Sequence, residues 1–161
     1  KEKGRNGRLP LHDAAENKAS DAVALALLAA HPEGVKEKGG GAGVSPLQLA
    51  LENNASDAVV LALLAAHPEG AKEKDRYGML ALHLAAANKA SDAVVLALLA
   101  EYPLASLRKD GKALLPLDIA LESGATREVL AALAQAQLKV LAVLADATQH
   151  IDLPVGAPPQ R

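Results

Sequence analysis

Five histidines are the side chains of this 161-residue chain best suited to acid–base or metal chemistry. His12 and His83 occupy the same place in two copies of a repeated motif, whereas His31 and His67 each precede a proline, where an imidazole can meet the last carbonyls of a helix. Stacked copies hold equivalent residues a repeat width apart, too far for a shared metal ion. We therefore expect the rings of His12 and His83 to hydrogen-bond to neighbouring turn backbone, and we expect no catalytic residue, metal ligand or cofactor site.

A glycine-rich stretch, Gly39 to Gly43, has the composition of a phosphate-binding loop. The letters that follow it are VSP, and the Lys-Ser or Lys-Thr pair of a P-loop is missing. An enlarged turn with one inserted residue is the better interpretation. Acidic pairs such as Asp13 and Glu16 have no neighbouring base or nucleophile in the pattern, so solvated surface charge is expected there. The chain has no cysteine, which excludes disulfides and thiolate chemistry.

Composition and charge narrow the classes of function. A net charge of −2 and a pI near 6.2 do not provide the basic surface that nucleic acid requires, and only two tyrosines could stack on bases. The longest apolar run, Ala22 to Ala30, is far shorter than the roughly 18 residues of a membrane helix, so no direct membrane insertion is expected. No secretory or transit segment is recognisable, which favours the cytoplasm, with an organelle and a removed transit segment as the alternative.

Nearly identical segments recur along the chain and indicate its architecture. The line SDAVALALLAAHPEG at 20–34 returns as SDAVVLALLAAHPEG at 56–70 and as SDAVVLALLAEYP at 91–103. The same phase is marked at intervals of 36, 35 and 35 residues by Pro10, Pro46, Ala81 and Pro116. Such a period is typical of stacked repeats, in which one unit is too small to bury its own apolar face. We place the units at about 1–35, 36–71, 72–107 and 108–135.

Each unit contains signals for a turn and two helices. In the third unit a polar turn precedes a short helix, which in three of the copies opens with proline, a residue that loses no hydrogen bond at this position. We expect this helix to end near Asn88, because asparagine tolerates the left-handed conformation. Ser91 is placed to cap the second helix and Pro103 to stop it. The predicted buried stripe is Val94, Val95, Leu98 and Leu99, with counterparts Val23, Leu27 and Leu28 in the first unit and Val59, Val60, Leu63 and Leu64 in the second.

A turn followed by two antiparallel helices, the first opened by proline, leucine and histidine, resembles the ankyrin repeat. The family motif is echoed by LPLHDAA, SPLQLAL, LALHLAA and LPLDIAL, and ALESGATREVLAAL places Gly124 on the family's glycine. The resemblance covers about residues 1–135 and implies an all-α, ankyrin-like helical repeat solenoid.

The chain also departs from the family pattern. The motif's threonine is absent, and Lys18, Asn54 and Lys89 replace the glycine between the helices. The period exceeds the family's roughly 33 residues, and we expect the added length to extend the second helix through AAHPEG. Tetratricopeptide units are the rival interpretation, but their tryptophan and tyrosine signature is missing.

The copies stop after Gln135. We expect residues 136–149 to form a helix that shields the open end of the stack as a terminal cap. Its predicted apolar side consists of Leu138, Leu141 and Leu144. Residues 151–161 contain three prolines and are expected to be extended or mobile. The chain opens with KEK, letters that follow the end of a copy elsewhere, so we expect it to be a piece of a longer array.

The function must come from the surface that the stack exposes. In an ankyrin-like stack the turns project as a row of fingers, and the short first helices line a concave face beside them. Residues that differ between copies on these elements are the candidate contacts for a partner protein: Arg5, Arg8, Asp13, Glu16, Arg76, Tyr77, Met79 and Lys112. Tyr77 with Arg76 and Met79 is the best anchor, because aromatic, arginine and methionine side chains are enriched in interface cores.

We predict a non-catalytic protein–protein interaction or scaffold module that binds another protein through a preorganised surface. The alternative is a structural spacer or linker subunit of a larger assembly, including one associated with a membrane. The apolar cap helix and the proline-rich tail motivate this alternative. A binding module should be soluble in isolation with a transient partner, whereas an embedded subunit should aggregate or co-purify with its neighbours.

Overall fold

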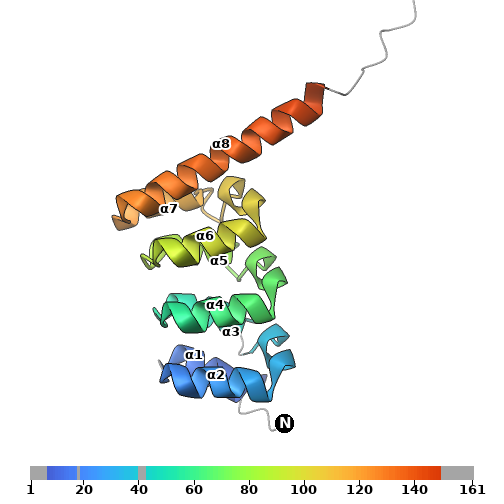
Figure 1. Cartoon of the computed structure of the whole chain (residues 1–161), viewed down its shortest axis with the longest axis vertical. Helices are drawn as coiled ribbons and strands as arrows, with labels where there is room; N and C mark the ends of the chain where they lie inside the picture. The colour runs from blue at the N-terminus through green and yellow to red at the C-terminus, as the bar shows by residue number, and fades with distance from the viewer. Residues whose placement is uncertain (1–6, 18, 40–42, 150–161) are drawn as a thin grey trace, which may run out of the picture.

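The computed structural model describes residues 7–17, 19–39 and 43–149, and these residues form a stack of helical hairpins (Figure 1). The first two hairpins consist of α1 (Pro10–Glu16) with α2 (Asp21–Ala30) and α3 (Pro46–Glu52) with α4 (Asp57–Ala66). The other two consist of α5 (Ala81–Ala87) with α6 (Asp92–Glu101) and α7 (Pro116–Ser123) with α8 (Arg127–Gln149). Three 3-10 turns connect the hairpins: η2 (Pro32–Lys36), η3 (Pro68–Lys72) and η4 (Pro103–Leu107).

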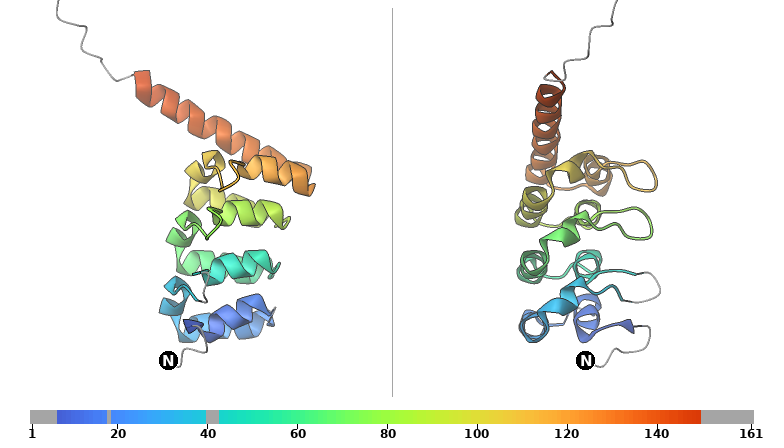
Figure 2. Two further views of the ribbon diagram at one scale, coloured as in Figure 1. Left: turned by 180° about the vertical axis from the view of Figure 1, so that it is seen from behind. Right: turned by 90° about the vertical axis from the view of Figure 1, so that its right-hand side faces the viewer.

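The hairpins stack in register, which confirms the predicted all-α repeat solenoid. The first helices α1, α3, α5 and α7 contact one another in sequence, and so do the second helices α2, α4, α6 and α8. Loops project to one side of the first helices, and the second helices lie on the other side (Figure 2). Following the prediction, we call these loops fingers and number them by the hairpin that each precedes. Within the described residues the fingers contain no strand, only a bridge between Gly39 and Val44.

The helix boundaries confirm the predicted starts and correct the predicted ends. Proline occupies the first turn of α1, α3 and α7, and the Ser91 hydroxyl accepts the Val94 amide at 3.3 Å, as a helix cap. Asn88 follows α5 as expected, but its φ is −97°, outside the left-handed region. Its Nδ2 instead donates to the Leu84 carbonyl at 3.0 Å, and the next residue, Lys89, is left-handed with φ 54°.

The predicted extension of the second helices is wrong. After each of the first three second helices the added residues form a separate 3-10 turn, because proline cannot donate to the preceding turn of the helix and begins a new segment. The turns bury Val35, Ala71 and Ala105 against neighbouring helices. The period is therefore longer than the family's because each unit contains an extra turn.

Small and branched side chains fill the space between hairpins. The predicted stripes of the second and third units are buried, and Ala50, Ala85 and Ala120 let the first helices approach closely. The first unit differs, because Val23 is 49% exposed and Leu27 and Leu28 are only partly buried. Their counterparts lie in α4 and α6, each of which packs against the second helix of the hairpin before it.

One buried polar side chain in each of the first three hairpins ties that hairpin to the next. His12 Nδ1 accepts the Leu9 amide at 3.2 Å, and its Nε2–H donates to the Glu37 carbonyl at 2.9 Å. His83 repeats both contacts, with the Leu80 amide at 3.1 Å and the Arg108 carbonyl at 3.0 Å. These bonds confirm the expected structural role of both histidines.

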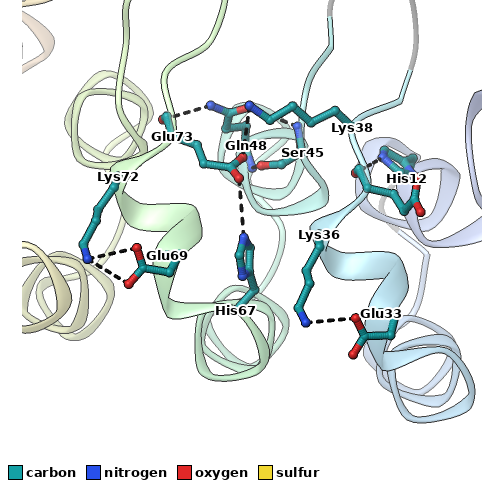
Figure 3. Close-up of polar contacts among 11 residues, drawn as sticks. His12, Glu33, Lys36, Lys38, Ser45, Gln48, His67, Glu69, Lys72 and Glu73 are labelled. Atoms are coloured by element: carbon teal, nitrogen blue, oxygen red, sulfur yellow. Dashed lines mark hydrogen bonds and ion pairs between the residues drawn. The ribbon is translucent and has the colours of Figure 1, made fainter.

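Gln48 makes the same pair of contacts in the second hairpin. Its Oε1 accepts the Ser45 amide at 3.0 Å, and its Nε2 donates to the Glu73 carbonyl at 3.3 Å (Figure 3). All three bridges span 25 residues, although the repeat period changes from 36 to 35. The extra residue of the longer period must therefore lie after Glu37, in the second finger, which agrees with the predicted enlarged turn.

The C-terminal end differs from the predicted cap helix at 136–149 in its start and in what it covers. Residues 127–149 form one continuous helix, α8, that serves both as the second helix of the fourth hairpin and as the extension beyond it. Val129, Leu133 and Val140 are buried, whereas Leu138, Leu141 and Leu144 are exposed. These leucines therefore do not shield the end of the stack, because the helix continues away from it (Figure 1). The predicted tail at 151–161 lies outside the described residues.

Within the described residues, one helix is long and apolar enough to cross a membrane by length and composition. It comprises 22 residues of α8, Arg127–Thr148, with a mean hydropathy of 1.6 and 17% of the window buried. Glutamines and Lys139 interrupt the apolar residues of this helix. The length of the longest uninterrupted apolar run therefore did not identify it as a candidate membrane span. The N-terminal half of α8 packs against α6 and α7, whereas most of the window is exposed.

The histidine bridges predict a loss of stability in mild acid. Burial lowers the pKa of His12 and of His83 below the ordinary 6.5, and their hydrogen bonds to backbone oppose this only in part. Below about pH 6.5 the unfolded chain binds protons that the folded chain excludes, so the free energy of unfolding should fall as the pH decreases from 7 to 5. Denaturant unfolding across this range measures the effect.

Gln48 provides the matched control for this prediction. His83→Gln should retain both hydrogen bonds and reduce the pH dependence, whereas His83→Ala should cost roughly 2–4 kcal/mol at neutral pH, because it leaves a buried amide and a carbonyl unpaired. An unchanged pH dependence in the variant with both His12→Gln and His83→Gln would contradict the assignment.

A second prediction concerns the left-handed residue after α5. Lys89→Gly should stabilise the protein by about 0.5–1 kcal/mol, because a left-handed side-chain residue is strained and the fourth unit has Gly124 at this place with φ 71°. Thermal unfolding measures the gain. Asn88→Gly is the control and should destabilise, since it removes the bond to the Leu84 carbonyl.

Candidate functional site

An aspartate at the base of each of the last two fingers shapes the finger. Asp75 Oδ1 accepts the amides of Tyr77 and Met79, both at 2.8 Å, and the Asp75 amide donates to the Met79 carbonyl at 3.0 Å. Asp110 repeats the arrangement with Lys112 and Leu114, at 2.8 and 2.9 Å. Neither aspartate was predicted from the sequence, although DRYG and DGKA occur in the same phase 35 residues apart.

The surroundings of Asp110 keep its carboxylate charged. Burial pushes the pKa of Asp110 upward, but the Leu114 and Lys112 amides, together with the nearby His83 and Lys112 side chains, outweigh it, so the pKa lies below the ordinary value. Because the ionised carboxylate accepts both amides, the finger keeps one conformation at neutral pH. The tip residues Tyr77 and Lys112 are thus presented by prearranged loops.

The third and fourth fingers enclose a groove with α5 and α7. Its volume is about 730 Å³. We call it the finger groove, and its lining is Arg76, Tyr77, Gly78, Met79, Ala87, Asp110, Gly111, Lys112, Leu114, Ile119 and Glu122. Four of the eight residues predicted from sequence lie here together: Arg76, Tyr77, Met79 and Lys112. Met79, Leu114 and Ile119 are at least partly buried, which leaves an apolar floor beneath a polar rim.

The rim of the finger groove carries an exposed aromatic ring and charges of both signs. The Arg76 guanidinium lies 4.7 Å from the centre of the Tyr77 ring, a cation–π contact, and Tyr77 is 59% exposed. Lys112 adds a second cation on the finger side, and Glu122 adds a carboxylate on α7.

Glu52 on α3 lies outside the finger groove but near the third finger. Burial raises its pKa, the charge of Asp75 raises it further, and the charge of Arg76 opposes the rise.

The tips of the third and fourth fingers touch through backbone. The Gly111 amide donates to the Tyr77 carbonyl at 2.9 Å. A Cβ atom on Gly111 would lie 2.5 Å from that carbonyl oxygen, and one on Gly78 would lie 3.0 Å from the Gly111 nitrogen. The two glycines therefore permit a contact that couples the two walls of the groove.

Three other predicted residues lie together at the first hairpin, away from the finger groove. Arg8 forms an ion pair with Glu16 and lies 4.0 Å from Asp13. The bond to Glu16 is the main cause of the raised pKa of Arg8, and the same bond lowers the pKa of Glu16. Arg8 and Asp13 occupy the places that Leu114 and Ile119 hold in the fourth unit, so a charged cluster replaces the apolar floor here. Arg5 lies outside the described residues.

A further polar cluster joins the second and third units. The Glu73 carboxylate lies between His67 Nε2 and Lys38 Nζ, each at 3.4 Å (Figure 3). His67 therefore meets a carboxylate instead of the helix carbonyls that were expected. In the described part of the chain no three His, Asp or Glu side chains gather as metal ligands would. The cluster serves as a link between the units.

Comparisons with known proteins agree with this geometry. A family model described as "Ankyrin repeats (3 copies)" matches residues 11–105, more than half of the chain. No curated protein sequence matches. The matched residues include the first three hairpins almost completely, and they include the third finger.

Among solved structures, 144 chains match this one. One belongs to a structure described as "Bd0816 Predatory Endopeptidase from Bdellovibrio bacteriovorus in complex with immunity protein Bd3460". It has a TM-score of 0.62 and 24% sequence identity, and the match covers 83% of this chain and 66% of that chain. At this identity the likeness shows a shared fold.

The contact between finger tips can be tested by adding one methyl group. Gly111→Ala should separate the fourth finger from the third, because the new Cβ would collide with the Tyr77 carbonyl. We expect a loss of about 1–2 kcal/mol in unfolding free energy and faster hydrogen exchange of the amide at position 111. Lys112→Ala, on the exposed side of the same tip, is the control and should change neither; equal effects of the two would refute the contact.

Proposed function

This chain belongs to the ankyrin repeat family, and from that membership we propose that it is a protein-interaction module whose binding surface is the finger groove. The observation that carries the proposal is the convergence of Arg76, Tyr77, Met79 and Lys112 on one groove. An exposed aromatic ring and an arginine above an apolar floor are the features of an interface hot spot.

The walls of the groove support binding by preorganisation. Asp75 and Asp110 hold the third and fourth fingers in shape, and the Gly111 amide joins their tips. A surface that is already ordered loses little conformational entropy when a partner docks. Affinity can then come from a modest area of contact.

The lining indicates the chemistry of the partner. An apolar side chain fits the floor formed by Met79, Leu114 and Ile119. Arg76 and Lys112 favour an acidic group at the finger side, and Glu122 favours a basic group at the helix side. We therefore propose a partner segment that carries an apolar anchor between charges of opposite sign.

The first hairpin contributes less to binding in this proposal. Arg8 already pairs with Glu16 and lies near Asp13, so a partner would have to compete with these contacts to engage the three side chains. We therefore propose that the interaction surface lies at the third and fourth fingers.

The role we propose is non-catalytic. The titratable members of the groove are bound to backbone or placed at the rim: Asp110 accepts two amides, and Arg76 lies on the Tyr77 ring. Neither arrangement presents a nucleophile with an adjacent base. Binding without turnover is the function that these side chains support.

The proposal can be tested by comparing what the full chain captures before and after changes in the groove. Proteins recovered with the wild type should be lost with Tyr77→Ala, and for a recovered partner the Kd should rise roughly 30-fold, which is about 2 kcal/mol. The melting temperature should stay unchanged, because Tyr77 is largely exposed. Mass spectrometry of the captured proteins and calorimetric titration measure these effects.

Arg8→Ala is the matched control, because it alters the finger of the first hairpin. It should leave both capture and Kd unchanged. Equal recovery of a partner by the wild type and by Tyr77→Ala would remove the finger groove from the proposal. A loss with Arg8→Ala alone would move the binding surface to the first hairpin.

A further inference from the structure

The fourth finger contains a peptide bond that is prone to spontaneous rearrangement. Asp110 is the one aspartate of the sequence that is followed by glycine. An aspartyl side chain can react with the backbone nitrogen of the next residue, and glycine allows this ring closure most readily because it has no Cβ atom in the way. Asp110 is half-buried and Gly111 is exposed, so water reaches the site.

The fold requires glycine at this position for a separate reason. A Cβ atom on Gly111 would lie 2.5 Å from the Tyr77 carbonyl oxygen, so a larger residue would push the two finger tips apart. The third finger shows the contrast. Asp75 accepts the amides of its own finger as Asp110 does, but Arg76 follows it, and the Cβ of Arg76 hinders ring closure. The contact between the fingers therefore brings a reactive Asp-Gly pair into the binding surface.

The closed fingers hold both reacting groups in unreactive states. The Gly111 nitrogen, which must attack, donates its hydrogen to the Tyr77 carbonyl at 2.9 Å. Oδ1 of Asp110 accepts the Lys112 and Leu114 amides at 2.8 and 2.9 Å, which directs the carboxylate along its own finger. Although burial pushes the pKa of Asp110 upward, the pKa lies below its ordinary value, and the ionised carboxylate resists attack by a nucleophile. Ring closure therefore requires that the two finger tips first separate.

We propose that Asp110 is a site of spontaneous isomerisation to isoaspartate and that the backbone bond between the finger tips controls its rate. In the open finger the Gly111 nitrogen forms a bond to Cγ of the protonated carboxyl group, the Cγ–OH bond breaks, and the hydroxyl leaves as water with the amide proton. Water then adds to the main-chain carbonyl carbon of the succinimide ring, and the bond from that carbon to the nitrogen breaks. One water is released and one is consumed, so no further reactant is needed.

Isomerisation would permanently dismantle the finger groove. The backbone gains one methylene group, and the carboxyl carbon that held the Lys112 and Leu114 amides becomes the link to Gly111. Both amides then lose their acceptor, so a finger that has opened and reacted cannot return to its closed shape. The loss of partner binding rests on the proposed function, whereas the isomerisation does not, so the two can be refuted separately.

Ageing of the full chain in neutral buffer, below its unfolding temperature, tests the site. Peptides that contain Asp110 or Asp75 are separated by chromatography at intervals, and electron-transfer mass spectrometry distinguishes isoaspartate from aspartate. In the guanidinium-unfolded chain we expect isoaspartate to accumulate at position 110 much faster than at position 75. In the folded chain accumulation at position 110 should be at least about tenfold slower, because it tracks the small fraction of molecules with open fingers.

Gly78→Ala tests whether the contact between the tips controls the rate. The new Cβ would lie 3.0 Å from the Gly111 nitrogen, and φ of +74° strains a side-chain residue, so the tips should separate and isoaspartate should form about tenfold faster than in the wild type. Gly7→Ala is the matched control, because Gly7 has the same phase in the first finger, a φ of +72° and nothing within 4 Å of the added Cβ. It should leave the rate at position 110 unchanged.

Hydrogen exchange at the Gly111 amide measures the opening itself and should be accelerated in Gly78→Ala by the same factor as isomerisation. The proposal would be overturned by equal rates at position 110 in the folded and unfolded chains, or by a Gly78→Ala variant that ages no faster than Gly7→Ala. It would also be overturned if the unfolded chain formed no isoaspartate at position 110 or formed it equally fast at position 75.

Discussion

The stack depends on one buried polar side chain at the start of the first helix in each of the first three hairpins. His12, Gln48 and His83 each accept an amide at the beginning of their own helix and donate to a carbonyl 25 residues later. Each bond closes a helix end and fixes the distance to the next unit at the same time. Because these groups are buried, an unpaired one would be costly, and this penalty keeps the hairpins in one register. The apolar contacts between helices do not define the register as strictly.

The positions of the fingers depend on this register of the hairpins. The carbonyls that accept the bonds, Glu73 and Arg108 among them, lie two residues before the aspartates that shape the third and fourth fingers. Errors in stacking would therefore shift Tyr77 and Lys112 relative to each other and open the groove. The second finger lacks such an aspartate and has Gly39 at that place, where a Cβ would lie 2.8 Å from the His12 ring.

Much of the fold could be predicted because the same letters recur in the same phase. The buried stripe at Val94 and Leu98, the cap at Ser91 and the structural role of His83 all follow from patterns that act within one hairpin. The predicted extension of the second helices failed because a proline can end a helix or begin a 3-10 turn, and only packing of Val35 and Ala71 distinguishes these outcomes. The prediction of a cap helix that starts at residue 136 failed in a similar way, since no sequence signal shows whether that helix continues the one before it.

The candidate site was predicted in part for a related reason. Differences between copies identified Arg76, Tyr77, Met79 and Lys112, but the same rule also selected Arg8, which pairs with Glu16. By itself, the sequence determined the repeat, the helix starts and the set of variable side chains, because these depend on local periodicity and capping. Only the tertiary structure decided which variable side chains face one groove, which neutralise one another and which leucines of α8 stay exposed, because these outcomes depend on distances between residues far apart along the chain.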